Sequence, residues 1–430
     1  MAVRNLGYHW AGYSLTKYGV CIPASAMSSA ALLARDMSSL PPREGRLLDP
    51  QLYLSGLSAD DSVLSVRRLA SYRWINPAVV SCAPSQTPSD WERTIETTLP
   101  ECWPPQVSCD AAEKSVRAQA CLQFQRDLGV RALVLPCPLT TDPRSDYSAE
   151  MEWLEAGLRA VPNGNDDPVW ATVALSDACL IHDEPPSNDL LQIIVDQVSA
   201  TAVDGVYVVL EQTVAGDSPY ISDARVAWAL LELSYYLGAR AHKTVMVNYA
   251  DVFGLACVGA GASWYAVGPT VKGRRLHLPD YQARDGGAAY PRFHSHSLIM
   301  DLLPKRDLEE RLRASRLLRF VASDRTASGR LLLEALERGD DADSVADWQE
   351  RLNNCSSSRR HYMELVTDRT DELVTSADRS EACLRWLQDA ERDSSYLASR
   401  LARNPLTAEH RHVAVWRSAF ESFLEEHGRH

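Results

Sequence analysis

The chain has 430 residues, of which 45% are hydrophobic and 23% charged, a composition typical of a globular protein with about two or three cores. Its formal net charge of -13 opposes nonspecific attachment to nucleic acid or to an anionic membrane, so a broad nucleic-acid surface is not expected. The sequence has no apolar run of membrane-spanning length, and its first residues lack the apolar stretch of a signal peptide. We therefore expect a cytoplasmic protein.

A strand pattern that recurs between residues 18 and 300 predicts the fold. Short apolar runs stop at a polar residue, and an amphipathic helix usually follows. Continuous apolar runs are typical of strands buried on both faces, and their alternation with helices indicates parallel pairing. We therefore predict a closed (β/α)8 TIM-like barrel over residues 1–305, followed by an all-helical segment over residues 306–430. The clearest strands are Ala132–Pro136, Trp170–Leu175, Val206–Leu210 and Thr244–Val247.

The first part of the predicted barrel begins with an irregular lead-in over residues 1–17. A region rich in Pro, Ser, Cys and Trp, at about residues 77–109, is predicted to be an irregular insertion, either part of a lid or a surface excursion. The elements expected around it are strands at Tyr18–Pro23 and Arg46–Leu54 and helices at Met27–Leu40, 59–72 and 110–128, the last with Asp110 as its N-cap.

Helices then alternate regularly with the central strands. The seventh strand is expected at Ala262–Val267 and the eighth at Phe293–Met300. Residues 306–430 carry Leu, Ala, Arg and Glu at helical spacing. This segment is predicted to be a cap packed against the barrel or a surface for dimerisation or a partner protein. The helices expected between the strands cover residues 146–160, 187–200 and 222–238.

Polar residues at the ends of the predicted strands are the candidate site, because strand ends on one side of such a barrel surround the active centre. Glu211 ends a fully apolar strand, where a charge facing the helices would be costly to bury. We expect it to be the principal catalytic carboxylate, with Asp49 or Asp177 as its partner. The alternatives are a salt-bridged glutamate at the rim, a turn at Asp49-Pro50, and Asp177 as a helix N-cap.

A second group is expected to bind the ligand. Asn248, Tyr249 and Asp251 place an amide, a phenol and a carboxylate at one strand end, although Asp251 alternatively caps the following helix. His294 and His296 share one face of a predicted strand, but a metal centre needs at least a third ligand. The ten cysteines are scattered without a CxxC pair. No metal and no cofactor are therefore predicted.

The loop Gly268–Arg275 stands out as basic in an acidic chain. Loops after the seventh and eighth strands of such barrels often bind phosphate through glycine amides. Lys272, Arg274 and Arg275 would add charge and bidentate donors, and we expect them to form an anion clamp. The alternative is a solvated connection. No P-loop, dinucleotide-binding or nucleophile-elbow motif is present.

Together these features predict a barrel enzyme, a hydrolase or a glycosyl or base transferase. Its ligand would be an anionic or phosphate-bearing small molecule, such as a nucleotide or glycosyl derivative, and its chemistry carboxylate acid/base or nucleophilic catalysis. One alternative is a non-catalytic barrel that binds or assembles through its helical segment. A further alternative is base exchange, as in barrel transglycosylases that modify nucleic-acid guanines. Those enzymes carry a Cys-rich zinc segment and an Asp nucleophile, and Gly261-Ala262-Ser263-Trp264 offers neither.

Overall fold

A computed structural model gives the arrangement of most of the chain. Among the residues that it describes, no helix combines the length and the apolar character needed to cross a bilayer. The predicted insertion at 77–109 lies largely outside the described residues. These are residues 2–5, 19–33, 40–58, 63–79, 93, 95–99, 103, 109–181, 189–213, 219–282, 289–408 and 410–428.

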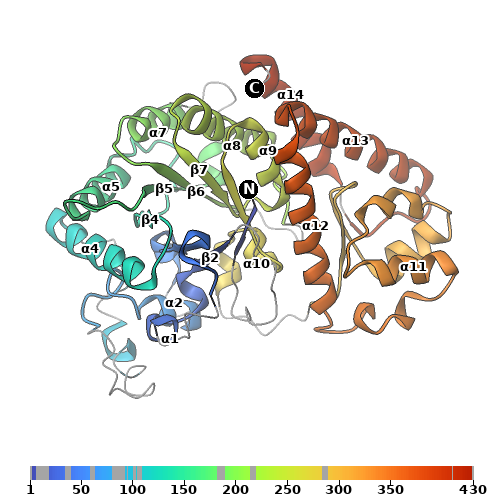
Figure 1. Cartoon of the computed structure of the whole chain (residues 1–430), viewed down its shortest axis with the longest axis horizontal. Helices are drawn as coiled ribbons and strands as arrows, with labels where there is room; N and C mark the ends of the chain where they lie inside the picture. Colours follow the sequence, from blue (N-terminus) through green and yellow to red (C-terminus); the bar gives the residue numbers. More distant parts are fainter. Residues whose placement is uncertain are drawn as a thin grey trace.

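Parallel strands form one main sheet, and helices lie on its outer side (Figure 1). The predicted α/β class is confirmed. The eight strands run in the order β3-β2-β1-β8-β7-β6-β5-β4. Their bounds are β1 Ala2–Asn5, β2 Val20–Pro23, β3 Arg46–Asp49, β4 Leu133–Val134, β5 Val169–Ser176, β6 Gly205–Glu211, β7 Thr244–Asn248 and β8 Trp264–Val267.

The predicted closed (β/α)8 barrel is wrong, because the sheet is curled but open. Its edge strands are β3 and β4, and no ladder joins them within the described residues. One backbone hydrogen bond, from Arg131 N to Arg46 O at 2.9 Å, links the chain before β4 to the start of β3. Pro50 follows β3 and Pro136 lies two residues beyond β4, and proline has no amide hydrogen to donate to a ladder. The two prolines limit how far either edge strand can extend at its carboxyl end.

Three strand predictions also need correction. The strand predicted over Arg46–Leu54 ends at Asp49, and a 3-10 helix, Leu52–Gly56, follows it. The lead-in contains β1, which pairs with both β2 and β8. The predicted eighth strand, Phe293–Met300, does not join the main sheet. It is divided between β9, Phe293–Ser295, and β10, Met300–Leu302, which pair as an antiparallel hairpin. The turn between them includes Ile299 with a positive φ of 54°, so the apolar run reverses direction instead of continuing.

Helices follow the strands as the sequence predicts. The predicted N-cap of α4 is confirmed, because the Asp110 carboxylate accepts a hydrogen bond from Glu113 N at 2.8 Å. The helices beside the sheet are α1 Ser29–Leu33, α2 Val63–Leu69, α4 Ala111–Leu128, α5 Ser148–Ala160, α6 Asp177–Leu180, α7 Asp189–Ser199, α8 Ala224–Leu233, α9 Gly254–Ala260 and α10 Val271–Arg274. The C-terminal helices are α11 Arg330–Arg338, α12 Ser356–Thr375, α13 Arg379–Arg400 and α14 Arg411–His427.

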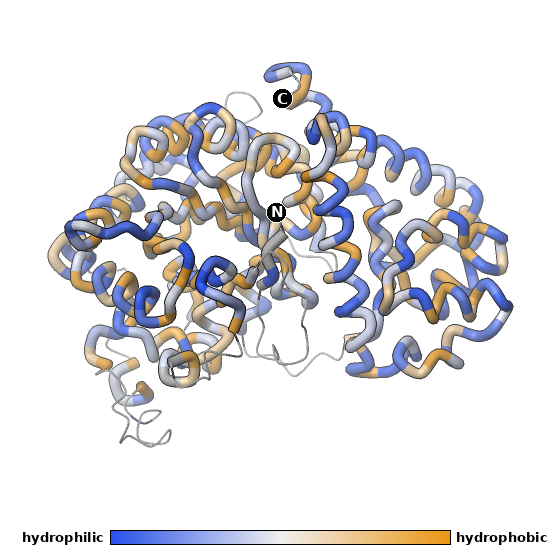
Figure 2. The backbone as a smooth tube through the Cα atoms, in the orientation of Figure 1, coloured by the Kyte–Doolittle hydropathy of each residue, from blue (hydrophilic) through white to orange (hydrophobic). Residues whose placement is uncertain are grey.

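The interior of the curled sheet is filled by side chains. Apolar stretches gather along the strands and on the inner sides of the helices (Figure 2). At the amino ends of the strands, the Arg131 guanidinium lies 4.3 Å from the ring centroid of Trp264. The cavity beside it, which Trp170 also lines, measures only about 10 Å³. This end of the sheet is closed by packing, so polar chemistry must be sought at the carboxyl ends.

The C-terminal helices bury their apolar stripes within the chain. Trp416, Phe420 and Phe423 of α14 are fully buried and belong to the same apolar core as the sheet. The Trp416 indole also donates to Ile221 O, before α8, at 2.8 Å. A second core gathers around Phe293, Leu308 and Trp348, among other residues. Neither set of apolar residues requires a partner chain to cover it.

The contact between α9 and α13 gives a first prediction. A Cβ added at Gly259 would lie 2.7 Å from Cys383 Sγ, closer than side-chain atoms can approach. Gly259→Ala should therefore lower the unfolding free energy by about 1 kcal/mol, because overpacking outweighs the gain in helix propensity. Adding Cys383→Ala should recover part of that loss, measured by urea denaturation. Strictly additive effects of the two substitutions would contradict this packing.

Candidate functional site

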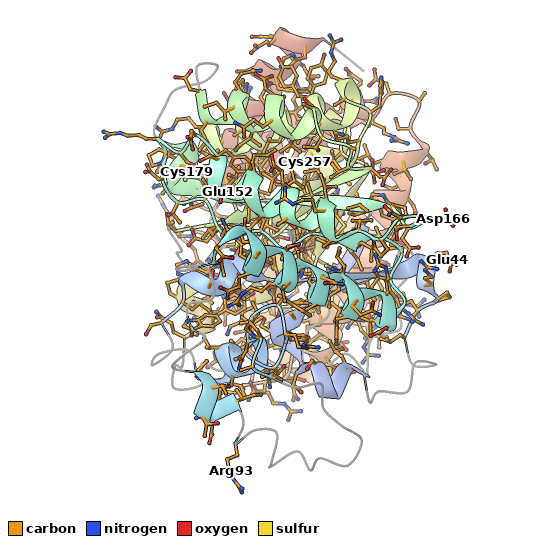
Figure 3. The ribbon with its side chains drawn as sticks, turned by 90° about the vertical axis from the view of Figure 1, so that its left-hand side faces the viewer. Glu44, Arg93, Glu152, Asp166, Cys179 and Cys257 are labelled. Carbon is orange, nitrogen blue, oxygen red and sulfur yellow. The ribbon has the colours of Figure 1, made fainter. Side chains whose placement is uncertain are left out.

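The two ends of the sheet lie on opposite sides of the molecule. Glu44 and Asp166 precede β3 and β5 in the chain, and Figure 3 shows them on one side. Cys179, which follows β5, lies on the opposite side (Figure 3). The carboxyl ends of the strands therefore face the side of Cys179, and in open parallel sheets ligands bind at these ends.

Asp49 lies at the carboxyl end of β3 in a cluster of phenols. The Tyr53 hydroxyl donates to Asp49 Oδ2 at 2.6 Å, and the Tyr249 hydroxyl donates to the same oxygen at 3.2 Å. Gln51 N donates to Asp49 Oδ1 at 3.2 Å, and the Gln51 amide donates to the Tyr249 hydroxyl at 3.3 Å. Since Tyr249 follows β7, the curl of the sheet brings strands that are distant in its order together across the interior.

Burial raises the pKa of Asp49 to about 6, although hydrogen bonds from Tyr53, Tyr207 and Tyr249 oppose the shift. The carboxyl is fully buried, and a buried carboxylate loses the hydration of its charged form. A carboxyl group that titrates near neutral pH is suited to proton exchange.

The backbone near this cluster adopts an unusual conformation. Gln51, Tyr249 and Asp251 have positive φ values of 54°, 63° and 47°. Residues other than glycine rarely adopt this left-handed region, and such strain is often found at functional sites. The strain here coincides with the ends of β3 and β7.

Glu211 forms a second cluster at the end of β6. Its side chain is nearly buried, and burial raises its pKa, an effect opposed by a hydrogen bond with Ser176 and by the nearby His277 and reinforced by Asp177. His277 Nδ1 lies 2.7 Å from the carbonyl oxygen of Gln212. A carbonyl only accepts, so Nδ1 carries the hydrogen, and in the neutral ring Nε2 is then the basic nitrogen.

The two clusters are linked through Gln212, the residue that follows Glu211. The Gln212 amide donates to Tyr249 O at 3.2 Å, and the Asn248 amide donates to the Tyr207 hydroxyl at 2.5 Å. Tyr207 and Glu211 lie on the same strand at even spacing, so they share one face of β6. We call this group the strand-end site, and its members are Asp49, Tyr207, Glu211, Asn248, Tyr249 and His277.

Two other predicted residues lie beside the strand-end site. Asp177 begins α6, and its carboxylate accepts from Thr213 N at 3.0 Å and from the Thr213 hydroxyl at 2.5 Å. It therefore fixes the segment after β6 and acts on Glu211 through its charge. Asp251 is fully buried and accepts a hydrogen bond from the hydroxyl of Tyr362 in α12. Asp251 therefore contacts the C-terminal helices and is not a member of the strand-end site.

The basic loop is engaged in internal interactions. Arg274 Nη1 donates to Asp301 Oδ2 at 2.6 Å, and both side chains are about nine-tenths buried. Arg275 pairs with Asp280 at 3.3 Å, and Lys272 Nζ lies 5.2 Å from the ring centroid of Tyr281. The charges of Arg274 and Arg275 are thus balanced by nearby carboxylates, which leaves the expected anion clamp without structural support.

The histidine pair of the sequence is divided by the hairpin. His294 Nδ1 contacts Asp301 Oδ1 at 2.9 Å, whereas the His296 ring stacks on Trp386, with centroids 4.6 Å apart. His296 and Trp386 border a cavity of about 390 Å³ between α12 and α13. The arginines that line it, Arg369 and Arg392, are each paired with carboxylates. The strand-end site is the better candidate because its side chains lie at the carboxyl ends of the parallel strands, where ligands bind in open sheets.

His277, Tyr207 and Gln51 were not predicted from the sequence. Tyr207 was predictable, because it precedes Glu211 by four residues on the same strand, and residues at even spacing along a strand share one face. His277 lies beyond the basic loop, and only the bridge between Leu276 and Glu211 brings it to the end of β6. Gln51 follows Pro50, and the sequence Asp49-Pro50 indicated an ordinary turn without a binding role for the next residue.

The raised pKa of Asp49 predicts a specific dependence of stability on pH. The group titrates near 3.8 in the unfolded chain and near 6 in the folded protein, so its favourable contribution is complete below pH 3.8 and lost as pH rises through 6. At about 1.36 kcal/mol per pKa unit, this loss of unfolding free energy amounts to about 3 kcal/mol. Asp49→Asn should therefore gain stability relative to the wild type as pH rises from 4 to 7, measured by urea denaturation.

The matched control is Asp110→Asn, because asparagine is also a good N-cap. This variant should follow the wild type over the whole pH range. Parallel stability curves for Asp49→Asn and the wild type would contradict the shifted titration of Asp49.

Comparison with protein-family models, with curated proteins and with solved structures found no match to this chain. Its function must therefore be inferred from its side chains.

Proposed function

We propose that the protein is an enzyme, a hydrolase or a glycosyl or base transferase, that uses carboxylate acid/base chemistry at the strand-end site. The observation that carries this proposal is the presence of two buried carboxyl groups with raised pKa values, Asp49 and Glu211, at the carboxyl ends of strands in clusters that Gln212 links. Carboxyl groups whose pKa values are raised by burial can hold a proton near neutral pH and donate it during a reaction.

Glu211 is the proposed general acid. In its protonated form it donates a proton to the leaving oxygen or nitrogen as the bond to the substrate carbon breaks. A water molecule or an acceptor hydroxyl then forms the new bond to that carbon and returns its proton to the Glu211 carboxylate. His277 is close enough to lower the pKa of Glu211, and we assign it the role of orienting the attacking group.

Asp49 is the proposed second carboxyl group. Its hydrogen bonds with Tyr53 and Tyr249 fix its orientation, and its pKa near 6 allows both protonation states at physiological pH. Asn248 and Tyr249 supply amide and phenol groups beside it. We propose that these groups orient the substrate.

The proposed substrate is a small glycosyl or nucleotide derivative. Phenols, amides and carboxylates are suited to substrates rich in hydroxyl groups, because each can donate to or accept from a hydroxyl. We propose a reducing, cytoplasmic setting, which agrees with the absence of a disulfide among the cysteines that the structure describes.

The test is substrate depletion in a metabolite extract, followed by mass spectrometry. The wild type and the surface control Glu155→Gln, which changes an exposed side chain of α5, should consume the same compound. Glu211→Gln and Asp49→Asn should leave it unchanged. Identical depletion by all four proteins would contradict the assignment of these residues, and no depletion by the wild type would count against catalysis.

A further inference from the structure

Three metal-binding side chains meet at the junction of α8 and α14, away from the strand-end site. One ligand atom from each of Glu232, Glu426 and His427 lies within 4.8 Å of the others. Glu232 is in the last turn of α8, whereas Glu426 and His427 end α14. Two carboxylates and an imidazole are ligand types that Zn²⁺ accepts in open sites, in which water takes the fourth position.

The surroundings of this cluster favour a cation. The side chains of His427 and Glu232 are only 7% and 3% exposed, and His427 Nε2 contacts Glu232 Oε1. Glu232 and Glu426 place carboxylate oxygens within 4.8 Å of each other, and a cation between them would relieve the repulsion of like charges. The carbonyl groups at the C-terminus of the 17-residue helix α14 add partial negative charge.

Aromatic rings enclose the imidazole on its inner side. The centroid of His427 lies 4.4 Å from that of Tyr235 and 5.1 Å from that of Phe423. Glu426 is exposed, so a cation has access from solvent and the Glu426 carboxylate is able to move toward it. After α8 ends at Leu233, the chain continues as a π-helix, Ser234–Arg240, and such segments occur frequently at functional sites.

We propose that Glu232, Glu426 and His427 bind a divalent transition metal ion, with Zn²⁺ as the preferred ion, and that this ion clamps the end of α14 to α8. Zinc–oxygen and zinc–nitrogen bonds of about 2.0–2.2 Å require the donors to lie roughly 3–4 Å apart. Glu232 Oε1 and His427 Nε2, now 2.5 Å apart, would have to separate by about 1 Å to reach this spacing, and the exposed Glu426 side chain would have to turn toward them. The metal would replace the contact between Glu232 and His427 and join helices that are distant in the sequence.

Zinc binding to the full-length protein is measured by competition with a chromophoric chelator, and Co²⁺ absorption reports the ligand geometry. Glu426→Gln is the main variant, because its exposed position does not endanger folding. It should weaken Zn²⁺ binding at this site by roughly 10–100-fold. Glu425→Gln, an exposed neighbour with the same charge change, should bind as the wild type does.

Zn²⁺ should also raise the midpoint of thermal unfolding of the wild type and of Glu425→Gln. The increase for Glu426→Gln should be much smaller. Glu232→Gln should reproduce the loss of binding from the other helix. Equal Zn²⁺ affinity in the wild type, Glu426→Gln and Glu232→Gln would show that the ion binds elsewhere. Absence of Zn²⁺ binding by the wild type would equally overturn the proposal.

Discussion

Glu211→Gln is expected to lower the turnover number for the substrate by about two to four orders of magnitude, the usual contribution of a general acid or base. Glutamine preserves the size of the side chain but cannot release or accept a proton. Because the pKa of Glu211 is raised above 4.5 by burial, the wild-type rate should fall as pH rises above that pKa and the acid deprotonates. This limb of the pH profile should disappear in Glu211→Gln.

Glu155→Gln is the control for turnover, because its carboxylate is exposed and pairs only with Arg159 among its described ion-pair partners. Its rate and pH profile should match those of the wild type. A Glu211→Gln enzyme with more than about a tenth of wild-type turnover would contradict a role as general acid.

Arg274→Met is expected to lower the unfolding free energy by about 3–5 kcal/mol, because it leaves buried carboxylates without their cation. Arg274 pairs with Asp301 of β10, and its guanidinium lies 3.6 Å from the ring centroid of Tyr362. Burial would raise the pKa of Asp301, but Arg274 and His294 lower it well below its ordinary value. Urea denaturation at neutral pH measures the loss.

The control for this effect is Arg330→Met, since the ion pair of Arg330 with Glu334 is largely exposed and should contribute at most about 1 kcal/mol. Adding Asp301→Asn to Arg274→Met should cost less than the sum of the single effects, because the two groups interact directly. Equal stability of Arg274→Met and Arg330→Met would contradict the buried network.

The central strands were predictable because each is a continuous run of apolar residues in the sequence. The apolar runs of β5, β6 and β7 are buried on both faces, as continuous runs require. Closure of the barrel was not predictable in the same way, since it depends on hydrogen bonds between β3 and β4, which are distant in the chain. Pro50 and Pro136 are visible in the sequence, but only the strand order shows that they lie beside the two edge strands.

The site was predicted in part for a similar reason. Glu211 and Asp49 follow apolar strands, so the sequence marks both as strand-end carboxylates. The partners of the basic loop could not be predicted, because Arg274 finds Asp301 through a hairpin that the sequence suggested was a single strand. The proximity of His277 to Glu211 likewise depends on a bridge between segments more than sixty residues apart.

The central claim, that the strand-end site binds the substrate, is tested most directly by a crystal structure of Glu211→Gln with the compound that the wild type consumes. The substitution blocks turnover and should leave the binding groups in place. We predict that the ligand lies within hydrogen-bonding distance of residue 211 and His277, beside Asn248 and Tyr249. A ligand bound instead in the cavity between α12 and α13, against His296 and Trp386, would contradict this claim.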